Sequence, residues 1–100
     1  MRAFAIFLAL CGLGFAGAPE GKAVFQARCQ PCHGANGEGK EAIAKMFKVE
    51  MHPLASKEVQ SKSDAELKKV ITAGTGKMKP VSGLSGEQVD DVVAFVRTLK

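Results

Sequence analysis

The chain has 100 residues, 46% of which are hydrophobic, and a formal net charge of +4. This length allows one domain at most. The small positive charge argues against a nucleic-acid-binding protein, which would show a concentrated basic stripe.

The first 18 residues have the pattern of a secretory signal peptide. A positive start at Arg2 precedes an uncharged apolar stretch over residues 3–15 and an Ala-Gly-Ala tripeptide. The apolar stretch is shorter than the roughly twenty residues of a bilayer span. We therefore expect residues 1–18 to be removed during export to the periplasm, although Pro19 allows the cleavage site to shift by a residue or two. Residues 19–100 would remain as one domain that does not span the membrane.

The next segment, residues 20–28, predicts a short helix with Phe25 on its apolar side. Gly21 stands four residues before Phe25, so the two residues share a face of that helix. A glycine weakens a helix, so its presence here indicates that another backbone or ring comes close. A frayed helix start is the alternative interpretation.

Residues 29–33 read Cys-Gln-Pro-Cys-His, which is the signature of covalent haem attachment. Cys29 and Cys32 can each form a thioether with one vinyl group of the porphyrin, and His33 can then bind the iron from one face. A zinc site would need more ligands, and outside the leader the chain offers only His52. A redox dithiol would need a preceding strand, which the pattern lacks. We therefore expect one covalently bound haem c.

This assignment has consequences for the rest of the chain. Once the leader is removed, both remaining cysteines belong to the haem motif, so we expect neither a disulfide nor a free thiol. A domain of about eighty residues is too small to bury a large hydrophobic core by itself and usually needs an additional stabilising group, such as a disulfide, a metal or a cofactor. The porphyrin would be that group, so we expect the chain without haem to be poorly folded.

A glycine-rich loop over residues 34–39 follows the haem motif, and it does not match a phosphate-binding pattern. Residues 41–48 then predict a weak helix with Ile43, Met46 and Phe47 facing inward. Beyond it, a proline breaks the pattern, and a loop with at most one helical turn is expected up to residue 62.

Two capping boxes mark the starts of two further helices, at Ser63 and at Ser85. The first helix is expected to end at Gly74, and the second to run to about Leu99. Each has one apolar face: Leu67, Val70 and Ile71 on the first, and Val89, Val92, Val93, Val96 and Leu99 with Phe95 beside them on the second. No period-two pattern appears, so the predicted fold class is all-α.

The sixth position of the iron has four candidate ligands, namely Met46, Met51, His52 and Met78. Met46 lies on the face of a predicted helix, where methionine is usually core filler. Met51 and His52 lie beside a proline and stay possible. Met78 is favoured, because the loop over residues 74–80 holds glycines before it and a proline after it, and a weak thioether ligand must be held in place by its loop. An open site is the remaining alternative.

These features together resemble the class I c-type cytochromes, the small monohaem proteins that bacteria export. The resemblance lies in the haem motif near the mature start, in the Gly-Lys-Met-x-Pro loop around Met78, and in the Asp-Val-Val-Ala-Phe-Val run at residues 91–96. It implies a cytochrome c fold, in which short helices wrap one haem and leave one haem edge exposed. It also implies that Gly21 and Phe25 meet Phe95 where the first and last helices cross, with His33 as proximal ligand and Met78 as distal ligand.

The chain departs from that family pattern at two places. No proline lies between His33 and Pro53, although many relatives use a proline carbonyl to accept the N–H of the proximal histidine. We expect a carbonyl around residues 40–43 to take this role. The chain also lacks Trp and Tyr, which hydrogen-bond a haem propionate in many relatives. Lysines, backbone N–H groups or water must serve instead.

The leading functional hypothesis is a periplasmic electron carrier that is a monomer and not an enzyme. It would pass one electron between redox partner proteins through the exposed haem edge, because a His/Met-ligated iron has no vacant site for a substrate. Lys77 and Lys79 could present a positive rim to an acidic partner, or they could simply be solvated. A haem sensor or small peroxidase with a displaceable sixth ligand is the first alternative, and a non-haem metal or thiol module is the second.

Overall fold

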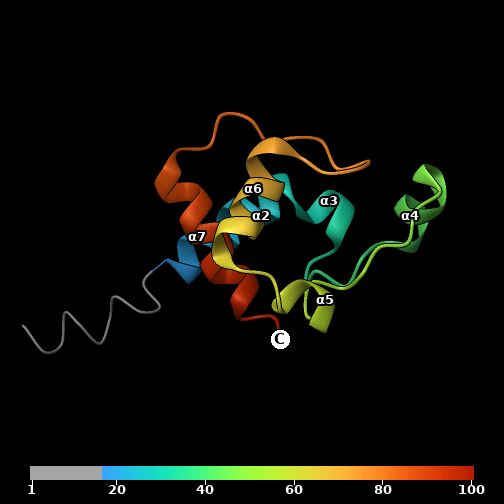
Figure 1. Ribbon diagram of the computed structural model, residues 1–100, viewed down its shortest axis with the longest axis horizontal. Helices are drawn as coiled ribbons and strands as arrows, with labels where there is room; N and C mark the ends of the chain where they lie inside the picture. Colours follow the sequence, from blue (N-terminus) through green and yellow to red (C-terminus); the bar gives the residue numbers. More distant parts are fainter. Residues whose placement is uncertain (1–16) are drawn as a thin grey trace, which may run out of the picture.

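The computed structural model describes residues 17–100, and Figure 1 shows how its helices are arranged. In chain order they are α2 (Ala18–Arg28), α3 (Gln30–His33), α4 (Glu41–Phe47), α5 (Lys57–Gln60), α6 (Asp64–Ala73) and α7 (Gly86–Arg97). This part of the chain contains no sheet, only an isolated bridge between Thr75 and Met78. The predicted all-α class is therefore confirmed. None of the helices described here is long and apolar enough to cross a bilayer.

The expected signal peptide lies outside the described residues, apart from its last two. Ala18 is the first residue of α2, and the carbonyl of Gly17 accepts a hydrogen bond from the N–H of Gly21 at 2.8 Å. The boundary between leader and domain stays a prediction.

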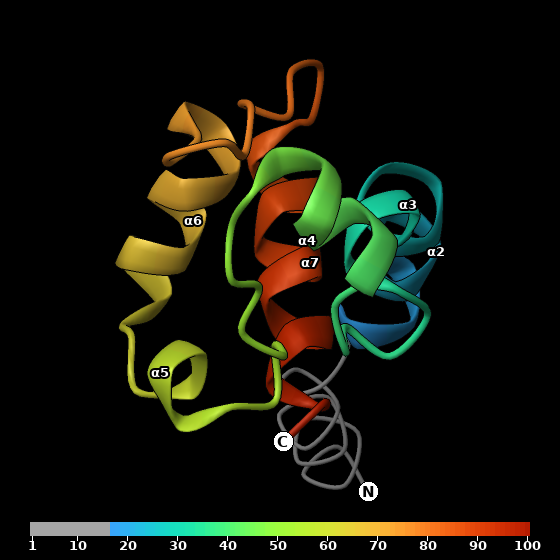
Figure 2. The ribbon, with the colours of Figure 1, turned by 90° about the vertical axis from the view of Figure 1, so that its right-hand side faces the viewer.

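The last helix, α7, forms the centre of the structure, with α2 on one side of it and α6 on the other (Figure 2). A Cβ atom added to Gly21 would overlap the carbonyl group of Asp91 and lie 3.0 Å from the backbone N of Val92. The two backbones therefore touch at this point. One turn further along α2, Phe25 is 1% exposed and its ring centroid lies 5.1 Å from that of Phe95. The expected crossing of first and last helices is confirmed, and it explains why a glycine stands inside α2.

The opposite face of α7 packs against α6 through aliphatic side chains. Both capping boxes form as predicted, with the hydroxyls of Ser63 and Ser85 each accepting from a backbone N–H three residues ahead, at 3.1 Å. An ion pair of 2.7 Å joins Lys68 of α6 to Asp90 of α7 at the surface. The buried cluster between the two helices consists of Leu67, Ile71, Val89, Val92, Val93 and Val96.

A network of hydrogen bonds connects α5, the start of α6 and the end of α7. The guanidinium of Arg97 donates to the Asp64 carboxylate at 2.8 Å and to the carbonyls of Gln60 and Lys62 at 3.0 and 2.6 Å. The side-chain amide of Gln60 donates in turn to the carbonyl of Val96 at 3.1 Å. These contacts tie the short α5 and the start of α6 to the last turn of α7.

The predicted inward face of α4 is wrong for two of its three residues. Ile43 is half-buried, whereas Met46 and Phe47 are 64% and 39% exposed, and α4 has no buried residue. Figure 1 shows the helix at one edge of the molecule, away from α7. Periodicity identifies side chains that share a helix face, but whether another element covers that face depends on tertiary packing.

Candidate functional site

The residues of the haem motif come from the junction between α2 and α3. Cys29 ends α2, donating its N–H to the carbonyl of Phe25 at 2.8 Å, and its own carbonyl accepts from the N–H of His33 at 3.0 Å. Pro31 lies in the first turn of α3, where a missing N–H costs nothing. Gly34 stops the helix in a left-handed conformation, with φ of 87°. Cys29, Cys32 and His33 thus lie on one short turn, as the motif requires.

Burial sets the protonation of these groups. Cys29 is half-buried and Cys32 is exposed. Burial raises the pKa of the Cys29 thiol, more than the charge of Arg28 lowers it. Burial also lowers the pKa of His33. The imidazole is therefore held in its neutral form at neutral pH, and this is the form that binds a metal ion.

The Nδ1 atom of His33 is buried and has no hydrogen-bond partner among the described residues. The backbone nearby does fold back on the motif, since Gly39 donates its N–H to the carbonyl of His33 at 2.7 Å. The carbonyl expected from residues 40–43 does not accept from Nδ1 in this structure. A buried polar atom without a partner is unusual in an ordinary core. It fits an imidazole whose orientation is set by binding a metal.

The loop after α6 holds Met78 rigidly. The N–H and the carbonyl of Met78 bond the carbonyl and the N–H of Thr75, at 2.8 and 3.0 Å. Gly74 has φ of 78°, and a Cβ there would lie 2.6 Å from the carbonyl oxygen of Met78 and 2.9 Å from Pro80. Val81 closes the loop by donating its N–H to the carbonyl of Ile71 at 2.8 Å. The side chain of Met78 is half-buried, on a backbone that has little freedom to move.

The haem motif and this loop lie on opposite sides of the structure. In Figure 2, α3 stands on one side and the loop after α6 on the other, with α7 behind and α4 in front. The guanidinium of Arg28 connects the two sides, donating to the carbonyl of Ser82 at 3.1 Å. A planar group attached at Cys29 and Cys32 would therefore lie beside His33. The residues present fit a covalently held haem.

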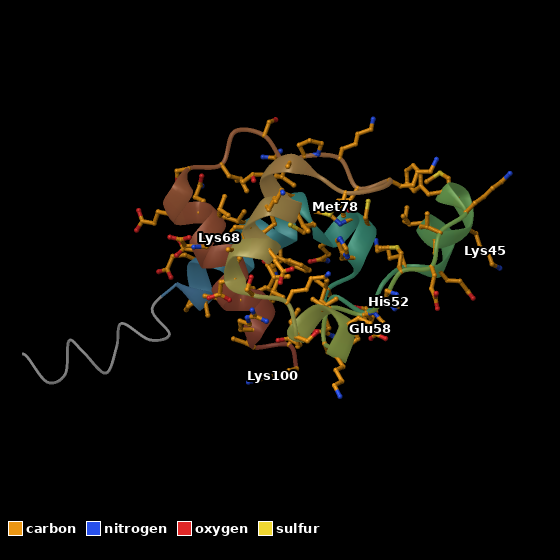
Figure 3. The ribbon with its side chains drawn as sticks, viewed as in Figure 1. Lys45, His52, Glu58, Lys68, Met78 and Lys100 are labelled. Carbon is orange, nitrogen blue, oxygen red and sulfur yellow. The ribbon has the colours of Figure 1, made fainter. Side chains whose placement is uncertain are left out.

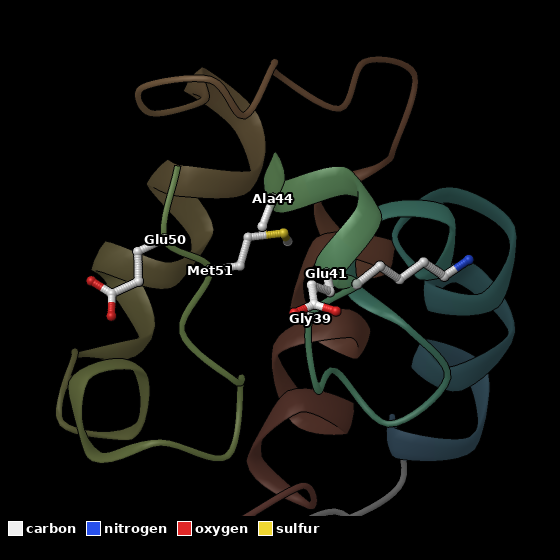
Figure 4. Close-up of a pocket in the computed structure, with 6 residues that line it drawn as sticks. Gly39, Glu41, Ala44, Glu50 and Met51 are labelled. Atoms are coloured by element: carbon white, nitrogen blue, oxygen red, sulfur yellow. The ribbon is translucent and has the colours of Figure 1, made fainter. Parts of the chain in front are cut away.

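The other candidate ligands are placed differently. Met46 is 64% exposed and lies on α4, at the edge of the molecule (Figure 1). Met51 is half-buried and lines a surface pocket next to Ala44 and Glu50, with Gly39, Lys40 and Glu41 (Figure 4). His52 is exposed and lies toward α5, whereas Met78 lies level with α3 in the same view (Figure 3). Residues 17–100 hold no cluster of three or more His, Cys, Asp or Glu that could bind a metal, so nothing in them favours the zinc alternative.

Comparison with known proteins supports the same identification. The family model described as cytochrome c matches residues 18–100. Among solved structures, the KustC0563 c-type cytochrome is similar to this chain, with a TM-score of 0.69 and 28% sequence identity over 80% of this chain and 96% of that one. The search of curated proteins gave no match.

A match over this length also identifies the fold and the cofactor. The structure has the cytochrome c fold, and members of the family carry electrons on a covalently attached haem c, for which Cys29 and Cys32 have the required spacing. The helices, the haem motif and the family match agree, and the chain belongs to the cytochrome c family.

Proposed function

We propose that this protein is an exported monohaem electron carrier whose iron is bound by His33 and Met78. In this proposal residues 1–18 direct export to the periplasm and are then removed. The mature protein, a monomer, exchanges single electrons with redox partner proteins and catalyses no reaction of its own.

The observation that carries this proposal is the rigidity of the Met78 loop. A thioether is a weak ligand for iron, so it remains bound only where the backbone holds it in position. Two backbone hydrogen bonds to Thr75, a left-handed Gly74 and the adjacent Pro80 hold it here. Met46 lies on α4 and is 64% exposed, and among the described residues Met51 has no comparable pair of backbone hydrogen bonds.

The chain's own residues have separate tasks in this proposal. Cys29 and Cys32 fix the ring beside α3, and the neutral His33 supplies the nitrogen ligand on one face. The soft sulfur of Met78 favours the ferrous state, which raises the reduction potential. Haem c supplies the one-electron redox centre. If His33 and Met78 both bind the iron, oxygen or peroxide would find no site on it, which favours electron transfer over a peroxidase or a gas sensor.

The deciding experiment is the visible spectrum of the haem-loaded protein in both redox states, for the wild type, Met78→Ala and Met46→Ala. We expect low-spin haem c with the weak ferric methionine–iron band in the wild type and in Met46→Ala. Met78→Ala should lose this band and bind cyanide or carbon monoxide. If the band is absent from the wild type and Met78→Ala changes nothing, His52 or an open site replaces Met78, and the sensor or peroxidase alternative is preferred.

Partner docking is the second part of the proposal. Lys77 and Lys79 are both exposed on either side of Met78, so they could form a positive rim for an acidic partner. The anionic oxidant hexacyanoferrate(III) is a suitable probe while the partner is unidentified. At low salt, Lys77→Gln/Lys79→Gln should slow its reaction with the reduced protein more than the matched change of the exposed Lys57 and Lys69. Equal rates in the two variants would show that the lysines are only solvated.

A further inference from the structure

Gly17, the residue directly before α2, takes part in the contact between α2 and α7. A Cβ atom added to Gly17 would lie 2.5 Å from the Oδ1 atom of Asp91 and 3.3 Å from its Cα. Gly21, four residues later on the same face, touches the backbone carbonyl of the same aspartate. The contact that Gly21 makes with α7 therefore extends back to Gly17, along the line where the two helices lie side by side (Figure 2).

Gly17 also supplies the acceptor for a buried N–H of α2. Its carbonyl accepts from the N–H of Gly21 at 2.8 Å, and Gly21 is buried. If the chain began at Pro19, this N–H would lose its acceptor, and a buried donor without a partner is costly. The folded domain therefore includes Gly17, which precedes by two residues the start expected from the Ala-Gly-Ala tripeptide.

Two peptide bonds near this point have the pattern of small residues that marks the end of a signal peptide. Ala16 and Ala18 precede the Ala18–Pro19 bond in this pattern, and Gly14 and Ala16 precede the Ala16–Gly17 bond. The Ala18–Pro19 bond is a tertiary amide, and the proline ring also restricts the residue before it. The Ala16–Gly17 bond has neither restriction. Cleavage at Ala16–Gly17 thus avoids the proline and keeps the first turn of α2 intact.

We propose that the leader is removed by hydrolysis of the Ala16–Gly17 bond, so that the mature chain begins at Gly17. Water adds across this bond: the leader leaves with the carboxylate of Ala16, and Gly17 keeps a free α-ammonium group. The proposal rests on the proposed export of the chain and moves its expected boundary by two residues. It depends on neither the haem nor the iron ligands.

The structure places a carboxylate beside the new ammonium group. The nitrogen of Gly17 is bonded to the same Cα as the added Cβ that would meet the carboxylate of Asp91, so the two charges lie close together. Asp91 is half-buried and forms no ion pair with the residues between 17 and 100. A positive charge at the start of a helix is unfavourable because of the helix dipole, and the carboxylates of Asp91 and of Glu20 in the first turn offset this effect. The fold is therefore compatible with a chain that starts at Gly17.

The test is the mass and N-terminal sequence of the haem-loaded protein that is recovered from the periplasm after expression of the full chain. Gly14→Phe and Ala18→Phe are the matched variants. Gly14 is the third residue before the Ala16–Gly17 bond but only the fifth before the Ala18–Pro19 bond. Ala18 lies beyond the Ala16–Gly17 bond but directly precedes the Ala18–Pro19 bond. A bulky residue should therefore block a different cleavage in each variant.

We expect wild type and Ala18→Phe to begin at Gly17, and Gly14→Phe to lose processing and accumulate as the uncleaved precursor. A wild-type chain that begins at Pro19, with loss of processing in Ala18→Phe, would overturn this proposal and leave the proposed export intact. A wild-type protein that keeps its whole leader would overturn both, because the leader would then not be removed at all.

Discussion

Gly21→Ala tests the closest contact in the fold. A single added methyl group would overlap the backbone carbonyl of Asp91 in α7. A backbone carbonyl inside a helix cannot turn aside as a flexible side chain can, so α2 must move away from α7. Any such movement also disturbs the ring contact between Phe25 and Phe95, which lies one turn further along the same interface.

The size of the effect follows from two opposing contributions. Overpacking a tight contact costs typically about 1–3 kcal/mol. Replacing glycine with alanine inside a helix contributes up to about 1 kcal/mol in the other direction. We expect the net loss to be about 1–2 kcal/mol, since the clash is with backbone. For a domain of this size, each kcal/mol lowers the melting temperature by about 4–8 °C.

Gly86→Ala is the matched control, because Gly86 also lies in a helix and a Cβ there would have no atom within 4 Å. Thermal unfolding of the haem-loaded proteins, followed by circular dichroism, should place Gly86→Ala at or above wild type and Gly21→Ala well below it. If Gly21→Ala melts at the same temperature as Gly86→Ala or higher, the α2–α7 backbones are not in contact and the reasoning is refuted.

Three further changes have definite expected outcomes. Gly74→Ala forces alanine into a left-handed conformation and against the carbonyl of Met78, so the ferric methionine band should be displaced by added imidazole at a lower concentration than in wild type. Arg97→Lys keeps the charge but loses the guanidinium's two hydrogen bonds to backbone carbonyls, and the urea midpoint should fall by the equivalent of about 1–3 kcal/mol with unchanged m. The backbone N–H and hydroxyl of Ser63 lower the pKa of Glu66, so its contribution is complete above the ordinary carboxyl pKa and disappears as the pH falls through the lowered value. Glu66→Ala should therefore destabilise the protein at neutral pH but not in strong acid, as urea unfolding at two pH values would show.

Local signals in the sequence predicted most of the helices. The two capping boxes begin α6 and α7 at the expected serines. They can be predicted because a capping box needs only the serine and a Glu or Gln three residues later. Gly74 ends α6, as expected of a glycine at that position. The predicted apolar stripe is buried within α7, as expected for apolar side chains at helical spacing, but α7 ends at Arg97, so Leu99 lies beyond it and is half-buried.

The wrong predictions, and the features that the sequence did not reveal, concern contacts between segments that are distant along the chain. Met46 and Phe47 follow a helical pattern yet are exposed, because none of the other helices between residues 17 and 100 covers α4. The role of Arg97, which joins the carbonyls of Gln60 and Lys62 to α7, left no signal in the sequence. The same is true of the buried hydroxyl of Ser56. These features depend on where distant segments meet, and spacing along one segment carries no information about that.

The sequence by itself determined the chemistry. The spacing of Cys29, Cys32 and His33 is a covalent requirement of the cofactor, and it can be read without any fold. Only the tertiary structure decided how the rest of the chain surrounds that motif: the backbone contact at Gly21, the hydrogen bonds that hold the loop around Met78, and the burial of Ser56. The physical reason is that a thioether motif is local, whereas the backbone contact at Gly21 and a buried hydroxyl are defined by groups that reach them from elsewhere in the chain.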